Sequence, residues 1–236
     1  MKTLCESLYE SLLDIGDVET NVEPIAMIDN WCKDNIGGNY TIDEKTLTIN
    51  SSSSITITNH KLVEFPSYIR FGIVNKNFSC SDCTSLKSLV GFPKEVGGDF
   101  WCDNCTSLKS LEGAPEKVEG VFSCTSCTSL TSLEGAPKEV GKGFYCSSCT
   151  SLTSLEGAPE KVGGSFYCNG CAYLESLEGA PEKVGGGFYC NYCVSLKSLK
   201  GAPKKIAGNF WCENCPSLKS LDGISAHIKD KIHSDI

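Results

Sequence analysis

A unit of 22 residues recurs seven times between Phe78 and Gly223, without any insertion or deletion. The unit reads F-x-C-x-x-C-x-S-L-x-S-L-x-G-x-P-x-x-V, and a short Gly-rich link joins it to the next copy. One copy is too short to enclose an apolar core of its own, so the copies must stack and share one. The strict period therefore predicts a solenoid in which each copy forms one coil.

The spacing of apolar residues within the unit predicts which side chains face the core. Phe144 and Cys146 are two apart, which places both on the inner side of a short strand and Tyr145 on the outer side. A second apolar arc begins at Leu152, and Val162 returns to the core after a Gly-x-Pro turn. Stacking at about 4.8 Å places each residue on its equivalent in the next coil, so we expect a mainly β fold with continuous inner columns.

The segments on either side of the repeats are predicted to close the two ends of the stack. Leu4, Leu8 and Leu12 fall on one helical stripe, and a second amphipathic helix begins behind Pro24. From Tyr40 the apolar period changes to two, as in strands. These patterns divide the chain into an acidic helical cap (1–38), a degenerate β capping coil (39–77), the seven repeats (78–223) and a C-terminal cap or tail (224–236).

Two short matches to the repeat lie in these flanking segments. Pro66 to Ile69 resembles the Pro-x-x-Val of a coil, and Ile228 keeps the Val position after the last repeat. We therefore expect a longer link between Ile69 and the first repeat. A polar tail that carries His227 and His233 is expected to finish the stack.

The distribution of charge argues against two classes of partner. The net charge is −8, and residues 1–44 hold two Lys and ten acidic residues, so the remaining 19 basic and 19 acidic residues balance. Residues 45–236 therefore offer no basic patch that would bind phosphate groups, so we expect neither nucleic acid nor a membrane as partner. Glu6 and Glu10 interrupt any signal-peptide stretch, and no run reaches the roughly 18 apolar residues of a membrane span. We expect a cytoplasmic protein whose 16 cysteines stay reduced.

The repeat resembles a known family of bacterial repeats. Cys149-x-x-Leu152-x-x-Leu155 with Pro159 and Val162 is similar to leucine-rich repeats of the surface-antigen (BspA-like) type. The resemblance implies a right-handed solenoid with a parallel sheet on one face and irregular coil on the other, and a protein that binds partners, some of them at cell surfaces. Similar Cys-rich repeats behind a Met-Lys-Thr-Leu start look like those of gut bacteria and their phages. The chain departs from the family in its second Cys and in a Phe that stands five residues before the shared Cys.

Each copy also carries a C-x-x-C pair, which is the motif of many zinc sites. Eighteen residues separate consecutive pairs, as in a four-Cys zinc ribbon. All pairs nevertheless share the register of the core Phe and Leu, Cys packs well as a small apolar group, and an odd number of pairs would leave one unmatched. We predict stacked free thiols and no cofactor, with zinc or disulfides as the lesser alternatives. The pairs are Cys80 and Cys83, Cys102 and Cys105, Cys124 and Cys127, Cys146 and Cys149, Cys168 and Cys171, Cys190 and Cys193, and Cys212 and Cys215.

The outward position between Phe and the first Cys is aromatic in five of the seven copies. The core does not require these rings, so a stripe of them predicts an interface. The alternative is that each ring only covers the next coil, as good strand formers do. The predicted binding residues are Trp101, Tyr145, Tyr167, Tyr189 and Trp211, with polar neighbours Asp103, Asn169, Asn191 and Glu213.

No catalytic partnership is visible in the repeats. Each copy holds a Ser at a coil corner, but all three His, at 60, 227 and 233, lie outside the repeats. We therefore predict a protein that is not an enzyme and that binds a protein partner as a scaffold or inhibitor. A surface adhesin or carbohydrate-binding protein is the alternative, since aromatic rings also stack on sugars. A zinc-binding repeat protein is the second alternative.

Overall fold

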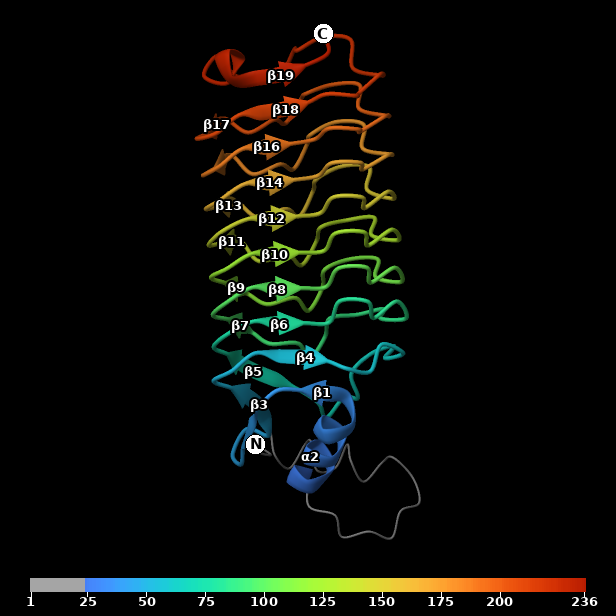
Figure 1. The fold of residues 1–236 in the computed structure, drawn as a ribbon, viewed down its shortest axis with the longest axis vertical. Coiled ribbons are helices and arrows are strands. Elements are labelled where there is room, and N and C mark those ends of the chain that lie inside the picture. Colours follow the sequence, from blue (N-terminus) through green and yellow to red (C-terminus); the bar gives the residue numbers. More distant parts are fainter. Residues whose placement is uncertain (1–23) are drawn as a thin grey trace, which may run out of the picture.

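A computed structural model describes residues 24–236, which form a tall stack of coils with a helix at its N-terminal end (Figure 1). The helix predicted on Leu4, Leu8 and Leu12, and most of the predicted cap 1–38, lie outside the described residues. Among residues 24–236, no helix is both long and apolar enough to cross a membrane.

Each coil contributes one short strand to each of two sheets. The first, here called the Phe sheet, has ten strands in the order β1 (Ile36–Gly37), β4 (Ile55–Ile57), β6 (Phe78–Ser79), β8 (Phe100–Trp101), β10 (Phe122–Ser123), β12 (Phe144–Tyr145), β14 (Phe166–Tyr167), β16 (Phe188–Tyr189), β18 (Phe210–Cys212) and β19 (Ile232–Ser234). The second, the Val sheet, has nine in the order β2 (Thr41–Asp43), β3 (Thr48–Ser51), β5 (Phe71–Val74), β7 (Glu95–Val96), β9 (Lys117–Val118), β11 (Glu139–Val140), β13 (Lys161–Val162), β15 (Lys183–Val184) and β17 (Lys205–Ile206).

The register follows the 22-residue period. Phe144 pairs with Phe166 and Tyr145 with Tyr167, and the repeats pair in parallel throughout both sheets. In Figure 1 the strands of the Phe sheet run from left to right at the front while the chain rises and returns behind them, so the coils are right-handed. The predicted mainly β, right-handed solenoid with parallel strands is confirmed. The Val sheet lies where irregular coil was expected, because each of its repeat strands buries a single residue and so lacks the alternation that Phe144 and Cys146 provide in the Phe sheet.

Identical side chains stack along the interior of the coils. The seven repeat Phe side chains are fully buried, and centroids of neighbouring rings lie 5.0 to 5.8 Å apart with the planes nearly parallel. Columns of Cys and Leu lie beside them, and the Val column closes the core at the other sheet. The core is therefore one continuous ladder, and each coil is stabilised by the coils next to it.

The N-terminal end of the stack is closed by antiparallel strands and by a helix. β1 pairs antiparallel with β4, and β2 with β3, which covers the first edge of each sheet. The predicted second helix is confirmed as α2 (Pro24–Asn35), which buries Ile28 and Cys32 and places Trp31 edge-on to Phe65 at 5.2 Å.

The alignment of Pro66 to Ile69 with the repeat is wrong. Ile69 donates its amide N–H to the Pro66 carbonyl in a turn, whereas Val74 pairs with Val96 and occupies the Val column. The strand β5 lies between that turn and the first repeat, so the expected longer link is largely a strand.

The C-terminal segment continues the Phe sheet. After a 3-10 turn (Lys229–Lys231), β19 places Ile232 opposite Phe210 and His233 opposite Trp211, in parallel. Ile228 is fully buried, as predicted for the Val position. The segment predicted as a polar tail therefore adds one further rung to the stack.

Candidate interaction surface

The outer face of the Phe sheet gathers all five predicted aromatic residues. Because Phe and Cys point inward, the residue between them points outward on every rung. Trp101 lies between Ser79 and Ser123 on the neighbouring rungs, while Tyr145, Tyr167, Tyr189 and Trp211 occupy four successive rungs. The sheet thus aligns all five on one face, with Ser123 separating Trp101 from the other four.

The last five rungs form what we call the aromatic ladder: Tyr145, Tyr167, Tyr189, Trp211 and His233. Tyr145 meets Tyr167 edge-on at 4.9 Å, Tyr167 and Tyr189 stack face to face at 4.3 Å, and Tyr189 lies parallel to Trp211 at 6.5 Å. The His233 ring stacks on Trp211 at 3.8 Å. His233 was not predicted as a site residue, although it follows Trp211 by the 22-residue period.

The rings of the ladder are half-buried, because each ring covers the next. The tyrosines also lie back over small residues on the same strand face, and a Cβ placed on Gly187 would lie only 2.8 Å from Tyr189 Cε2. Partial burial raises the pKa of the Tyr145 and Tyr189 hydroxyls. The surface therefore presents ring edges and neutral hydroxyl groups, which suit apolar contact and hydrogen bonding.

The predicted polar neighbours form a ladder of their own. Asp103 Oδ1 accepts a hydrogen bond from the Thr125 amide at 2.8 Å, and Asn169 Oδ1 accepts one from the Asn191 amide at 2.9 Å. Asn191 Oδ1 accepts from the Glu213 amide at 2.8 Å. These side-chain oxygens accept hydrogen bonds from backbone amides of the next coil. Their first role is therefore to stabilise the stack of coils, ahead of any contact with a partner.

Two carboxylates of this column differ in their surroundings. Burial raises the pKa of Asp103, whose carboxylate also accepts a hydrogen bond from the Ser123 hydroxyl. The Glu213 carboxylate makes no hydrogen bond or ion pair to any residue within 24–236. Among the four predicted polar residues, Glu213 is therefore the one whose charged carboxylate is available to contact a partner.

The thiols of the C-x-x-C pairs form an internal ladder. In six successive coils the second Cys donates its thiol to the carbonyl oxygen of the first Cys of the preceding coil, with Sγ to O distances of 3.1 to 3.3 Å. All of these cysteines are buried and free of disulfides. Burial raises the pKa of Cys83 and of Cys212 to about 12. Residues 24–236 hold no group of three or more metal-binding side chains.

We expect these buried thiols to resist modification while the protein is folded. The thiolate is the reactive form, and burial suppresses both its formation and its access to reagent. Reaction with Ellman's reagent should be at least about 100-fold slower in the native state than in guanidinium chloride. Cys5 lies outside the described residues, so a Cys5→Ala variant is the control. Rapid native labelling of repeat cysteines in that variant would contradict the buried ladder.

Comparison of the chain with protein-family models, with curated proteins and with solved structures found no match. The resemblance to surface-antigen repeats therefore rests on the motif residues alone. A solenoid supports many functions, so the fold alone does not indicate one.

Proposed function

We propose that this chain is a non-enzymatic binding protein that engages a protein partner through the outer face of the Phe sheet. The observation that carries the proposal is the aromatic ladder, in which four successive repeat rungs from Tyr145 to Trp211 hold Tyr or Trp at a position that the core does not need. Tyr and Trp are the residues that most often dominate the binding energy of protein interfaces. Three intervals of about 4.8 Å make these four rungs about 14 Å long.

The way the rings stack favours a protein over a sugar. Sugars pack against the open face of an aromatic ring, but Tyr167 and Tyr189 cover each other's faces with planes 2° apart. Trp211 and His233 do the same at 10°. Tyr145 instead lies edge-on to Tyr167, and Trp101 has a serine on each neighbouring rung. The stacked part of the ladder presents ring edges, to which the tyrosine hydroxyls add polar groups, and this fits the mixed apolar and polar surface of a protein partner. The proposal is made for a reducing compartment, where the cysteines remain thiols.

Replacement of the three tyrosines tests the proposal. The variant Tyr145→Ser, Tyr167→Ser, Tyr189→Ser removes the ring edges and leaves the inner Phe column intact. In affinity purification from native lysate with mass spectrometry, we expect a protein that the wild type enriches to fall by at least about tenfold with this variant.

A matched variant separates the surface from the fold. Glu112→Ser, Glu134→Ser and Glu156→Ser change three exposed residues that lie away from the strands of the Phe sheet. This variant should enrich the same protein as the wild type, and both variants should keep the circular dichroism spectrum of the wild type. Equal enrichment by the tyrosine variant and the wild type would refute the assignment of the surface.

A further inference from the structure

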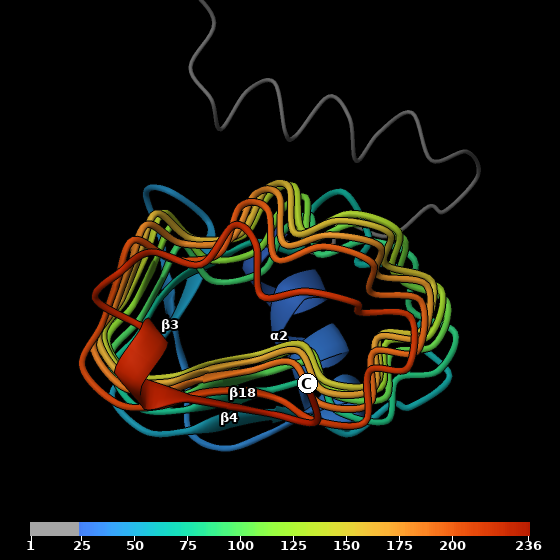
Figure 2. The ribbon, with the colours of Figure 1, turned by 90° about the horizontal axis from the view of Figure 1, so that it is seen from above.

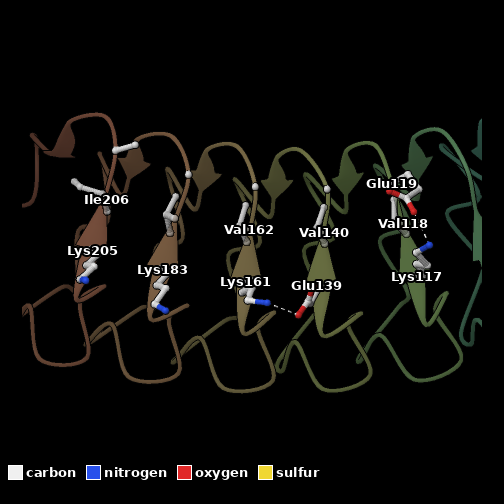
Figure 3. Close-up of a pocket in the computed structure, with 15 residues that line it drawn as sticks. Lys117, Val118, Glu119, Glu139, Val140, Lys161, Val162, Lys183, Lys205 and Ile206 are labelled. Carbon is white, nitrogen blue, oxygen red and sulfur yellow. Dashed lines mark hydrogen bonds and ion pairs between the residues drawn. The ribbon is translucent and has the colours of Figure 1, made fainter.

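A groove runs along the Val sheet, which lies on a different side of the stack from the Phe sheet (Figure 2). Figure 3 shows this groove, which has a volume of about 590 Å³ and extends across five successive strands from β9 to β17. Val140, Val162, Val184 and Ile206 line its floor, with nearly all of each side chain turned into the core. Four intervals of about 4.8 Å give it a length of about 19 Å, which matches about six residues of extended peptide.

The groove exists because the chain carries almost no side chains where it leaves the Val sheet. Gly141, Gly163 and Gly185 line the groove one coil apart. A Cβ on Gly163 would collide with the Gly141 carbonyl oxygen, and one on Gly185 with that of Gly163. Glycine thus allows these three coils to stack closely, whereas the equivalent residues of the flanking coils are Glu119 and Ala207, and the missing side chains leave a channel beside the Val column.

Lysines give one half of the groove an unbalanced positive charge. Lys117 pairs with Glu119 at 2.6 Å and Lys161 with Glu139 at 2.7 Å, so these four charges compensate one another. Lys183 and Lys205 also line the groove and are exposed, and neither forms an ion pair with any residue within 24–236. The two free ammonium groups belong to adjacent coils, next to the apolar residues Val184 and Ile206.

We propose that this groove binds an extended, acidic segment of another protein. Side chains alternate along an extended peptide, and those at i and i+2 lie about 7 Å apart. Two carboxylates on one side of such a segment could reach Lys183 and Lys205, which line the groove. Within residues 24–236 only two unpaired ammonium groups line the groove, beside the paired carboxylates of Glu119 and Glu139, and these are too few for a nucleic acid, which carries a charge on every nucleotide. This site is separate from the aromatic ladder and does not depend on it.

Fluorescence anisotropy with the full-length protein tests the proposal. The probe is a fluorescein-labelled peptide, Ser-Glu-Val-Glu-Ser-Glu-Val-Glu, and its counterpart has Gln in place of every Glu. We expect saturable binding of the acidic probe, at least about tenfold weaker binding of the Gln peptide, and weakening between about 50 mM and about 500 mM NaCl. The variant Lys183→Glu, Lys205→Glu should bind the acidic probe at least about tenfold more weakly than the wild type.

A variant with the same change in net charge provides the control. Lys87→Glu, Lys109→Glu reverses two exposed lysines that do not line the groove, and it should bind the probe as the wild type does. The tyrosine variant of the aromatic ladder should also keep its affinity. The proposal is overturned if the acidic and Gln peptides bind alike, if both lysine variants weaken binding equally, or if an oligothymidylate of similar length binds as tightly as the peptide.

Discussion

The protein is expected to unfold cooperatively as the pH rises from about 9 toward 12. Burial raises the pKa of Cys32, Cys83 and Cys212 from 9.0 to about 12. A thiol whose pKa is higher in the folded protein than in the unfolded chain stabilises the folded state. This contribution is fully present below pH 9.0, which is the pKa in the unfolded chain, and it is lost as the pH rises through the pKa of the folded state. Above pH 9 these thiols ionise in the unfolded chain but stay protonated in the folded one, so alkali favours unfolding.

The expected effect is as large as the stability of a typical domain. Each thiol that ionises only on unfolding lowers the free energy of unfolding by about 1.4 kcal/mol per pH unit. Three thiols over three units sum to on the order of 10 kcal/mol, and a domain is stable by about 5 to 15 kcal/mol. Urea unfolding followed by circular dichroism at several pH values measures the slope.

A single substitution tests whether thiols cause this alkaline loss. Cys212→Ala removes one titrating group, so the slope of unfolding free energy between pH 9 and 11 should become shallower by about 1.4 kcal/mol per pH unit. A variant on the surface, Lys87→Ala, should leave the slope unchanged. A slope that stays the same in Cys212→Ala would show that other groups drive the transition.

Phe144→Ala is expected to lower the free energy of unfolding by about 3 to 5 kcal/mol. The ring is fully buried in the middle of the Phe column, and its centroid lies 5.2 Å from that of Phe122 and 5.4 Å from that of Phe166. Its removal leaves a cavity that neighbouring coils cannot fill, since each is held in register on both sides, and it also removes two ring contacts. Urea unfolding at neutral pH measures the loss.

The adjacent residue supplies the matched control. Tyr145 lies on the same strand but on the outer face and is half-buried, so Tyr145→Ala should lower stability by no more than about 1 to 2 kcal/mol. Phe210→Ala should fall between the two, because within residues 24–236 Phe210 has a ring neighbour only on the Phe188 side. Equal losses for Phe144→Ala and Tyr145→Ala would contradict the division into inner and outer faces.

The repeated unit predicts most of the architecture. The two-residue spacing of Phe144 and Cys146 places them inside and Tyr145 outside, and the strict period aligns each with its equivalent in the next coil. These features could be predicted because the seven copies share one local pattern, so a departure in a single copy does not obscure it. The stripe of five aromatic residues could be predicted for the same reason.

Features that depend on contacts between coils could not be predicted in this way. Strands such as β13 bury only one residue and have no second inward residue to form an alternating pattern, so the Val sheet appears only when the coils are stacked. The polarity of Asn169 is visible in the sequence, but its bond to the Asn191 amide is a contact between coils. His233 could have been predicted as a site residue from the sequence. Ile232 follows Phe210 by the 22-residue period, although Ile stands in place of Phe, and His233 therefore takes the position of Trp211.

The fixed register of the coils also bears on how such a protein changes over generations. Each coil meets its neighbours through the same columns of Phe, Cys, Leu and Val, so a whole coil can be gained or lost without creating a new kind of contact. Slippage between near-identical stretches of the gene would lengthen or shorten the protein by complete rungs. The extent of its outer faces could then be adjusted by copy number, while point substitutions at outward positions alter one rung at a time.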